Sequence, residues 1–320
     1  MAQKPQTMRQ SFAVTTTFSD AGYHSYGQQM IQSFDRYWPR DIVLHVYYEG
    51  QKPDICSPRI SYHDIKIECP DLITFLERNK DNPRDTSRYA SILTPLGELA
   101  AYKKWYEQQP ENIGRPLQIR HKEDGTATLR VKYAGTKFSF KSYVQYYASK
   151  AVDTDCLIWI DADSRFLKPI PCDLLERLCP PSSLVSFLGR HSPNYTETGW
   201  LAFNRRHQLF EYFMKRIKEI YDTDALYDLD SYHDCWVFDT VRKLFEQEYG
   251  AKTHNLSTAY NINSQHPLLE TPLGGYVDHF KGIRGKKYKR STPKTVARHP
   301  NTFRNFLKKA RRPINIFRQR

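Results

Sequence analysis

The sequence predicts an α/β fold with a mostly parallel sheet flanked by helices, and three observations carry that prediction. Residues 12–18, FAVTTTF, are rich in β-branched and aromatic residues, as buried strands are. Residues 25–38 carry apolar side chains at helical spacing and end before a proline, and residues 42–48 then form a second apolar run. This strand–helix–strand order implies parallel pairing through a right-handed crossover. A further apolar run, CLIWI at residues 156–160, leads directly into two acids.

The rest of the chain alternates between helical and strand patterns, without an internal repeat. We expect strands at 65–67, 184–188 and 200–203, and helices at 72–79, 87–109, 139–152, 206–221 and 229–249. Residues 110–137 are polar and contain three glycines. They are typical of an insertion or loop, with room for a small hairpin around residues 127–131.

The composition is that of a folded protein. The chain has 320 residues, of which 39% are hydrophobic and 14% aromatic. No stretch approaches the roughly 18 uninterrupted apolar residues of a membrane span. Residues 1–10 are polar and lack the apolar centre of a signal peptide, so we expect a cytoplasmic protein. The six cysteines form no CxxC pair, which favours buried thiols over zinc ligands or disulfides.

The positive charge of the chain is concentrated at its C-terminus. The formal net charge is +13, and residues 281–320 hold fifteen Lys and Arg and no acid. The other residues hold 33 of the 48 basic side chains against all 35 acids, so the body is nearly neutral. Such a segment favours a polyanionic partner: nucleic acid, acidic lipid headgroups or a nucleotide diphosphate. The alternative is a solvated tail that aids solubility. We therefore divide the chain into a domain at 1–290 and a basic tail at 291–320.

Asp161 and Asp163 are the most informative residues of the sequence. They follow the predicted strand at 156–160 and lie two positions apart. Alternate residues of an extended segment point the same way, so two hard oxygen donors lie side by side. This pair suits Mg²⁺ or Mn²⁺ held between protein and a diphosphate, and open α/β sheets bind ligands at such strand ends. The alternative is an ordinary solvated turn.

Four segments resemble nucleotide-sugar-dependent glycosyltransferases of the GT-A fold. They are VTTTF at 14–18, WIDAD at 159–163, ETGWLAFN at 197–204, and HFKG at 279–282 followed by two lysines. The second resembles the family's DxD strand. The last is similar to the His-x-x-Gly and lysine element of glycogenin-like and lipopolysaccharide galactosyltransferases. The resemblance covers about residues 12–287 and implies a GT-A-like, doubly wound sheet and a hexosyltransferase type of enzyme.

The resemblance implies a donor site around a divalent cation. Asp163 and His279 would be metal ligands, and Asp161 would bind the metal or contact the ribose or a metal-bound water. A nucleotide sugar, with UDP favoured, would be the donor. Residues implied to border its nucleoside are Thr16, Thr17, Phe18, Tyr23 and Glu49, with apolar packing the alternative for Phe18. Residues implied to face its diphosphate are Lys141, Lys281, Gly282, Arg284, Lys286 and Lys287, with a surface lysine the alternative for Lys141.

The acceptor side is implied by two further acids. Asp234 stands where inverting relatives keep a general base, and Glu197 competes for that role. Either could instead be a helix-terminal acid or a hydrogen-bonding partner. The glycogenin-like group has Asn-Ala-Gly and Asp-Gln-Asp where this chain has Glu197-Thr198-Gly199 and YHDCW at 232–236. Because of this departure, the resemblance leaves inversion and retention both open.

Three functions follow, two of them enzymatic and one non-catalytic. The favoured one is transfer of a sugar to hydroxymethylated pyrimidines in DNA, because Lys and Arg contacts to phosphates would supply affinity. The second keeps the chemistry but builds a lipid-linked or cell-surface glycan at an anionic membrane, since residues 303–317 interleave aromatic and basic side chains. The third is a non-catalytic nucleic-acid-binding protein, which the Asp161 and Asp163 pair disfavours.

Overall fold

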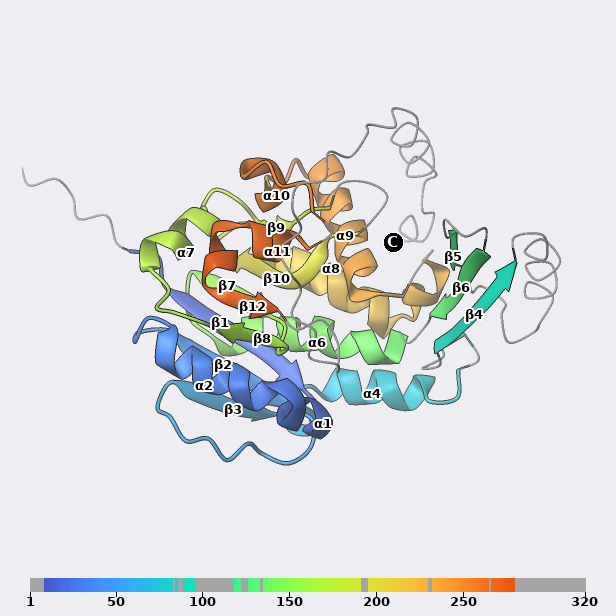
Figure 1. Ribbon diagram of the computed structural model, residues 1–320, viewed down its shortest axis with the longest axis horizontal. Coiled ribbons are helices and arrows are strands. Elements are labelled where there is room, and N and C mark those ends of the chain that lie inside the picture. The colour runs from blue at the N-terminus through green and yellow to red at the C-terminus, as the bar shows by residue number, and fades with distance from the viewer. Residues whose placement is uncertain are drawn as a thin grey trace, which may run out of the picture.

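A seven-stranded, mostly parallel sheet forms the centre of the protein (Figure 1). The computed structural model describes residues 9–82, 84–85, 89–95, 118–121, 126–132, 135–190, 195–229, 232–264 and 266–279. Across the sheet the strands are β11 (His254–Asn255), β9 (Val185–Leu188), β10 (Glu197–Asn204), β7 (Cys156–Ile160), β1 (Phe12–Phe18), β2 (Val43–Tyr48) and β3 (Ile60–Asp64). Strands β7, β1, β2 and β3 run parallel, whereas β10 is antiparallel to both neighbours. The predicted fold class is confirmed.

Helices cover both faces of the sheet because the buried strands are apolar on both sides. One core cluster joins the sheet to α4 (Pro70–Asn79), α6 (Gly135–Ala151), α8 (Phe210–Asp222) and α9 (Asp234–Glu248). The other joins it to α2 (Gln28–Tyr37), α7 (Cys172–Leu178) and α11 (Pro267–Glu270). Successive residues of β1 alternate between the clusters, with Ala13 in the first and Val14 in the second.

Short elements and two small sheets complete the described chain. The short helices are α1 (Asp20–Gly22), α3 (Ile65–Glu68), α10 (Leu256–Ala259), a π-helix at Tyr23–Gly27, and 3-10 helices at Ala225–Asp228 and Pro272–Gly275. Strands β8 (Ser164–Phe166) and β12 (Val277–His279) pair antiparallel. Strands β4 (Tyr89–Pro95), β6 (Thr126–Lys132) and β5 (Gln118–His121) form a three-stranded antiparallel sheet in that order.

Two local predictions are wrong. Residues 65–67 are helical, because the Asp64 side chain accepts a hydrogen bond from the Lys66 amide and caps α3, and the third strand is Ile60–Asp64. After β1 ends at Phe18, the Ser19 hydroxyl accepts a hydrogen bond from Gly22 N and caps α1. A strand, β4, replaces the start of the helix predicted at 87–109, because β6 offers it an antiparallel partner. The predicted hairpin is confirmed as β5 and β6.

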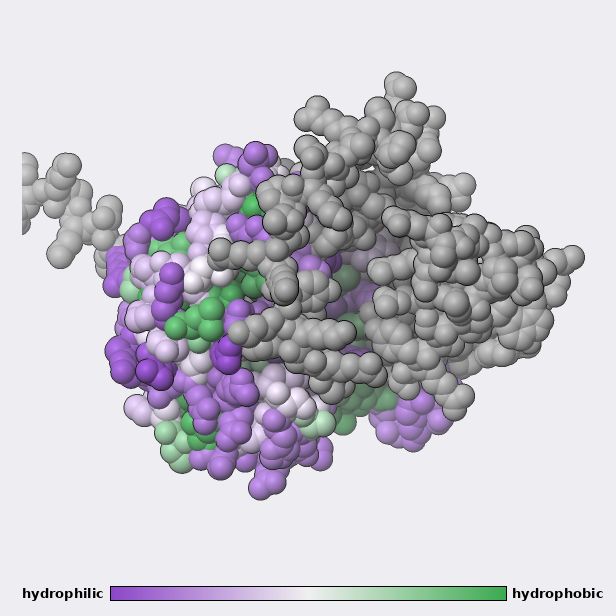
Figure 2. All heavy atoms as spheres, in the orientation of Figure 1, coloured by the Kyte–Doolittle hydropathy of each residue, from purple (hydrophilic) through white to green (hydrophobic). Residues whose placement is uncertain are grey.

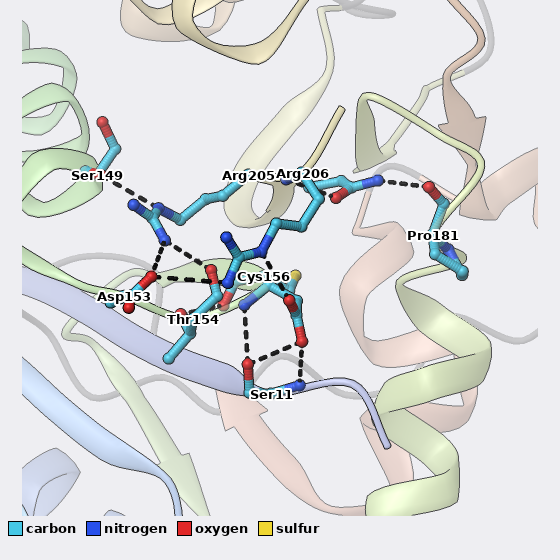
Figure 3. Close-up of polar contacts among 10 residues, drawn as sticks. Ser11, Ser149, Asp153, Thr154, Cys156, Pro181, Arg205 and Arg206 are labelled. Atoms are coloured by element: carbon cyan, nitrogen blue, oxygen red, sulfur yellow. Dashed lines mark hydrogen bonds and ion pairs between the residues drawn. The ribbon is translucent and has the colours of Figure 1, made fainter. Parts of the chain in front are cut away.

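A polar network fixes the end of the sheet opposite the acids (Figure 3). Asp155 accepts hydrogen bonds from Ser11 N at 2.9 Å and Ser11 Oγ at 2.8 Å, and from Arg206 Nε at 2.8 Å. Arg205 donates to the Thr154 carbonyl at 2.6 Å. These contacts join the starts of β1 and β7 to the end of β10. The acids at the other end of β7 therefore extend from a strand that is held in register.

His45 and His63 form a partly buried pair on neighbouring strands, and we expect them to make folding sensitive to acid. Their ring nitrogens lie 3.0 Å apart. Burial, with a smaller effect of His63, lowers the pKa of His45 to about 4. The unfolded chain therefore takes up this proton first as the pH falls below about 6.5, and the stability is lost progressively towards pH 4. Urea unfolding should show about 2 kcal/mol less stability near pH 5 than near pH 7 from this residue. A His45→Gln variant should flatten that dependence, and an unchanged slope would contradict the assignment.

The described chain contains no helix that is both long and apolar enough to cross a bilayer. Among the coloured residues in Figure 2, most on the visible face are hydrophilic, with small hydrophobic areas between them. All six cysteines are free, and Cys69, Cys156 and Cys179 are buried, whereas Cys56 is exposed. The expected thiol state is thus confirmed, although burial applies to only part of the set.

Candidate metal and donor site

Asp161 leaves the end of β7 with its two carboxylate oxygens facing different neighbours. Its backbone N–H donates to the Gly199 carbonyl of β10 at 2.9 Å, which holds the two strand ends together. Oδ1 accepts from Trp159 Nε1 at 2.8 Å and lies 2.7 Å from Lys141 Nζ. Oδ2 faces the space above Gly199. One oxygen is thus held by donors, while the other can serve a ligand.

His279 joins the two acids through the small β8–β12 ladder. This antiparallel pairing places His279 opposite Ser164, the residue after Asp163. His279 Nε2 lies 3.1 Å from Asp163 Oδ1, and the His279 side chain is 3% exposed. Ligand atoms of Asp161, Asp163 and His279 all lie within 4.8 Å of one another. The structure therefore brings the three sequence-predicted metal ligands together from segments more than a hundred residues apart.

The three residues fit a small divalent cation. Two carboxylates and an imidazole are the donor types expected for Mn²⁺, and Mg²⁺ would use the carboxylates with water. Gly199 makes the space for this arrangement. A Cβ built there would lie 2.9 Å from His279 Cε1 and 3.4 Å from Asp161 Oδ2. A side chain at position 199 would fill the gap between the ligands.

We expect Gly199→Ala to weaken Mn²⁺ binding by about 10–100-fold, because a displacement of the ligands by a fraction of an ångström is costly at such sites. Isothermal titration calorimetry on the intact protein would measure it. Gly250→Ala is a matched control: Gly250 has a φ of +62° and no atom within 4 Å of a built Cβ. That change should lower stability through backbone strain without altering Mn²⁺ affinity. If Gly199→Ala bound Mn²⁺ as tightly as the natural protein, the proposed need for a glycine between the metal ligands would be wrong.

Lys141 links Asp161 to Asp234. Its ammonium lies 2.7 Å from Asp161 Oδ1 and 2.9 Å from Asp234 Oδ2, and it donates to the Thr198 carbonyl at 3.1 Å. Burial alone would lower the pKa of Lys141, but the two carboxylates outweigh it and raise the pKa. Lys141 is thus a charged group inside the site, not a surface lysine.

Asp234 is the first residue of α9 and is buried. Its Oδ2 accepts a hydrogen bond from the Thr198 hydroxyl at 2.5 Å. Burial alone would raise its pKa, but the charge of Lys141, aided by the Thr198 hydroxyl, lowers it. The helix N-terminus also favours a negative charge at this position. Asp234 is therefore ionised at neutral pH and lies in the same constellation as Asp161.

Glu197 is placed differently from Asp234. It lies on the other side of β10, with a side chain that is 1% exposed. Its Oε1 is 3.5 Å from His279 Nδ1 and 3.7 Å from Arg190, and its Oε2 accepts from the Leu268 amide at 3.4 Å. Glu197, the alternative to Asp234 as a general base, therefore lies beside Nδ1 of His279, on the side of the ring away from Asp163.

The predicted nucleoside residues are mostly engaged within the fold. Thr17 donates to the Tyr47 carbonyl at 2.7 Å, and Tyr23 donates to Asp54 at 2.5 Å. Phe18 is buried and packs against Tyr23 at a ring distance of 5.6 Å, as its packing alternative predicts. The Thr16 hydroxyl is buried without a hydrogen-bond partner among the described residues. Of these four, Thr16 alone therefore has an unused polar atom near the end of β1.

Glu49 and Tyr26 extend the site towards β2. Burial raises the pKa of Glu49, and Asp20 adds to this effect. Burial also raises the pKa of the Tyr26 hydroxyl, with further contributions from Asp163 and Asp161. Glu49 contributes as well, so Tyr26 lies within electrostatic reach of all three acids. The sequence analysis missed Tyr26, although it belongs to a π-helix, an element frequent at functional sites.

An aromatic cluster beside Asp234 was also missed. It consists of Phe138 of α6, Tyr195 before β10, His233 before α9, and Trp236 in the first turn of α9. Ring distances are 4.6 Å for Phe138 and His233 and 4.4 Å for Tyr195 and Trp236. All four are partly exposed. The sequence analysis also missed Thr198 and Arg190. The sequence does not show which way side chains point at a bulge such as that of β10, so it does not show which charged groups they meet.

The predicted diphosphate residues beyond His279 lie outside the described residues. These are Lys281, Gly282, Arg284, Lys286 and Lys287, together with the rest of the basic tail. Their roles remain predictions.

No protein-family model matches the chain, and no curated protein sequence matches it. Among solved structures, it is similar to the apo form of mouse xyloside xylosyltransferase 1, with a TM-score of 0.39 and 12% identity over 77% of this chain and 84% of that chain. It is also similar to the apo form of the glycosyltransferase GlyE of Streptococcus pneumoniae TIGR4, with a TM-score of 0.40 and 10% identity over 88% of this chain and 58% of that chain. The match thus spans less than two thirds of the GlyE chain.

Proposed function

We propose that the protein is a divalent-metal-dependent glycosyltransferase that moves a sugar from a nucleotide-sugar donor to an acceptor hydroxyl. The cluster of Asp161, Asp163 and His279 is the observation that carries this proposal. A bound Mn²⁺ or Mg²⁺ would neutralise charge on the departing nucleoside diphosphate. We further propose residues 1–290 as the catalytic domain and 291–320 as a basic tail.

Lys141 and Asp234, which lie beside the cluster, would act on the leaving group and the acceptor. In the reaction, the bond from the anomeric carbon to the diphosphate breaks and the nucleoside diphosphate departs. A bond to the acceptor oxygen forms, and the proton of the acceptor hydroxyl is released to solvent water. Lys141 keeps Asp234 ionised and adds a positive charge beside Asp161 and the leaving group. The lowered pKa of Asp234 makes it a weak base. It is therefore better suited to orient the acceptor hydroxyl as a hydrogen-bond acceptor than to store the proton.

The donor assignment can be tested by hydrolysis. UDP-, GDP- and CDP-sugars would be incubated with the intact protein, with Mn²⁺ added or with a chelator, and release of the nucleoside diphosphate measured. We expect turnover of one nucleotide class, with UDP favoured, that disappears with the chelator. Neither turnover nor binding of any sugar nucleotide in the presence of Mn²⁺ would contradict the proposal.

For the acceptor, we propose hydroxymethylated pyrimidines in DNA, supported by the fifteen basic residues and no acid at 281–320. Transfer to a hydroxymethylcytosine duplex should fall steeply with salt, while an unmodified duplex should accept no sugar. Salt-independent transfer would count against phosphate contacts. The alternative, a membrane-surface glycan, predicts co-sedimentation with anionic liposomes instead of a DNA gel shift. The non-catalytic alternative predicts DNA binding without donor turnover.

A further inference from the structure

We propose that Glu197 is a positioning residue that holds His279 from behind, so that Nδ1 keeps a hydrogen towards Glu197 and Nε2 is left to bind a divalent cation. This inference rests on the metal site of the proposed function and assigns Glu197 a role other than that of a general base. Carboxylates behind metal-binding histidines commonly fix the ring and its tautomer.

Each nitrogen of the His279 ring faces a carboxylate. Nδ1 lies 3.5 Å from Glu197 Oε1, and Nε2 lies 3.1 Å from Asp163 Oδ1. A neutral imidazole carries one N–H, so one of its nitrogens must present a lone pair to a carboxylate oxygen. A divalent cation beside Nε2 and Asp163 removes this conflict, because both groups then share their electron pairs with it. Nδ1–H can then point towards Glu197.

Glu197 lies too deep to meet an acceptor. Its side chain is 1% exposed, and the His279 side chain is 3% exposed. Glu197 also lies 3.7 Å from Arg190 and accepts a hydrogen bond from the Leu268 amide of α11 at 3.4 Å. These contacts tie the segment that ends in His279 to the sheet. By contrast, the aromatic cluster that could face an acceptor lies beside Asp234.

The irregular path of β10 produces this arrangement. Glu197 pairs with Leu188 and Leu201 with Phe187, so the residues between them bulge out of the ladder. Within the bulge, Thr198 contacts Lys141 and Asp234, whereas Gly199 faces His279. Glu197, at the start of the bulge, lies on the His279 side. Three consecutive residues therefore have three different neighbours. Glu197 lies beside the His279 ring, Thr198 contacts Lys141 and Asp234, and Gly199 leaves space between the predicted metal ligands.

Mn²⁺ binding to the intact protein tests the proposal independently of sugar transfer. We would measure Mn²⁺ affinity by isothermal titration calorimetry and by electron paramagnetic resonance of the bound ion. Glu197→Leu should weaken binding by about 10–100-fold, as loss of such outer partners typically does. Glu197→Gln should lose less than about 10-fold, since its amide oxygen still accepts from Nδ1–H. Thermal unfolding would confirm that each variant is folded.

Asp239→Asn is a matched control. Asp239 is also a buried acid paired with an arginine, Arg242, at 3.0 Å, and it binds Thr196, the neighbour of Glu197. These bonds join Asp239 to Arg242 and Thr196 and not to His279. The Mn²⁺ affinity of Asp239→Asn should therefore equal that of the natural protein. Comparable weakening in Asp239→Asn and Glu197→Leu would overturn the proposal, since general loosening would then explain both.

Every other outcome also decides the matter. Natural Mn²⁺ affinity in folded Glu197→Leu overturns the positioning role. If Glu197→Leu fails to fold, Glu197→Gln decides, and a loss of more than about 10-fold there would exclude the hydrogen-bonding role. A natural protein that binds no Mn²⁺ refutes the metal site and this inference together. A natural protein that binds Mn²⁺ with the expected variant pattern, but turns over no sugar nucleotide, refutes the proposed function alone.

Discussion

Replacement of Asp163 by asparagine is expected to lower sugar-nucleotide turnover by about 10³-fold or more while leaving the protein folded. Asp163 lies 3.1 Å from His279 Nε2 and is 19% exposed, so its carboxylate is open to a ligand yet fixed by the β8–β12 ladder. Asparagine keeps the volume but removes the charge. Donor hydrolysis and Mn²⁺ affinity should fall together.

The stability of Asp163→Asn to urea shows whether Asp163 serves a functional or a structural role. Asp163 and Asp161 place carboxylate oxygens within 4.8 Å of each other. Without a cation, two like charges at this distance repel, so Asp163→Asn should leave urea stability unchanged or slightly higher. Asp173→Asn, at an exposed acid that pairs with Arg177 on α7, controls for loss of charge elsewhere. Natural turnover by Asp163→Asn, or a large loss of stability, would refute the assignment of Asp163 as a metal ligand.

The sequence was most informative where one physical preference dominated. Strands β1 and β7 match their predicted ranges, because an apolar, β-branched run that is buried on both faces has few other uses. The acids at 161 and 163 were found for the same reason, since the end of a buried strand is a defined place in an open α/β fold. His279 entered through the resemblance, and the register of β12 with β8 explains its position.

Predictions failed where a single side chain or a distant partner decided the structure. Asp64 converts an apolar Ile-Lys-Ile stretch into a capped helix. A remote strand, β6, pairs with residues that have helical spacing. The role of Glu197 depended on a bulge whose register no sequence period reveals. The Tyr26 hydroxyl comes near the acids only through a π-helix.

Replacement of Lys141 by methionine is expected to reduce both stability and turnover. The ammonium lies within 2.9 Å of two carboxylates, and its side chain is 16% exposed. Methionine fills a similar volume, so packing against Trp159 is retained while the charge is lost. Asp161 and Asp234 would then be left without their shared cation, and removing one partner of a buried ion pair costs about 3–5 kcal/mol. Urea unfolding would measure this loss, and donor hydrolysis the accompanying fall in activity.

A second substitution distinguishes charge balance from packing. In the Lys141→Met/Asp234→Asn double variant, Asp161 is the one remaining acid of the two that contact Lys141, and Trp159 Nε1 still donates to it at 2.8 Å. The double variant should therefore recover part of the stability that Lys141→Met loses, but not the turnover, because the charge beside the diphosphate stays absent. Lys141→Arg should retain most of the stability, since it restores a cation for both acids. The outcome against this coupling is additivity. The free energy of unfolding that the double variant loses would then equal the sum of the losses of Lys141→Met and Asp234→Asn measured separately, and Lys141 and Asp234 would not be energetically coupled.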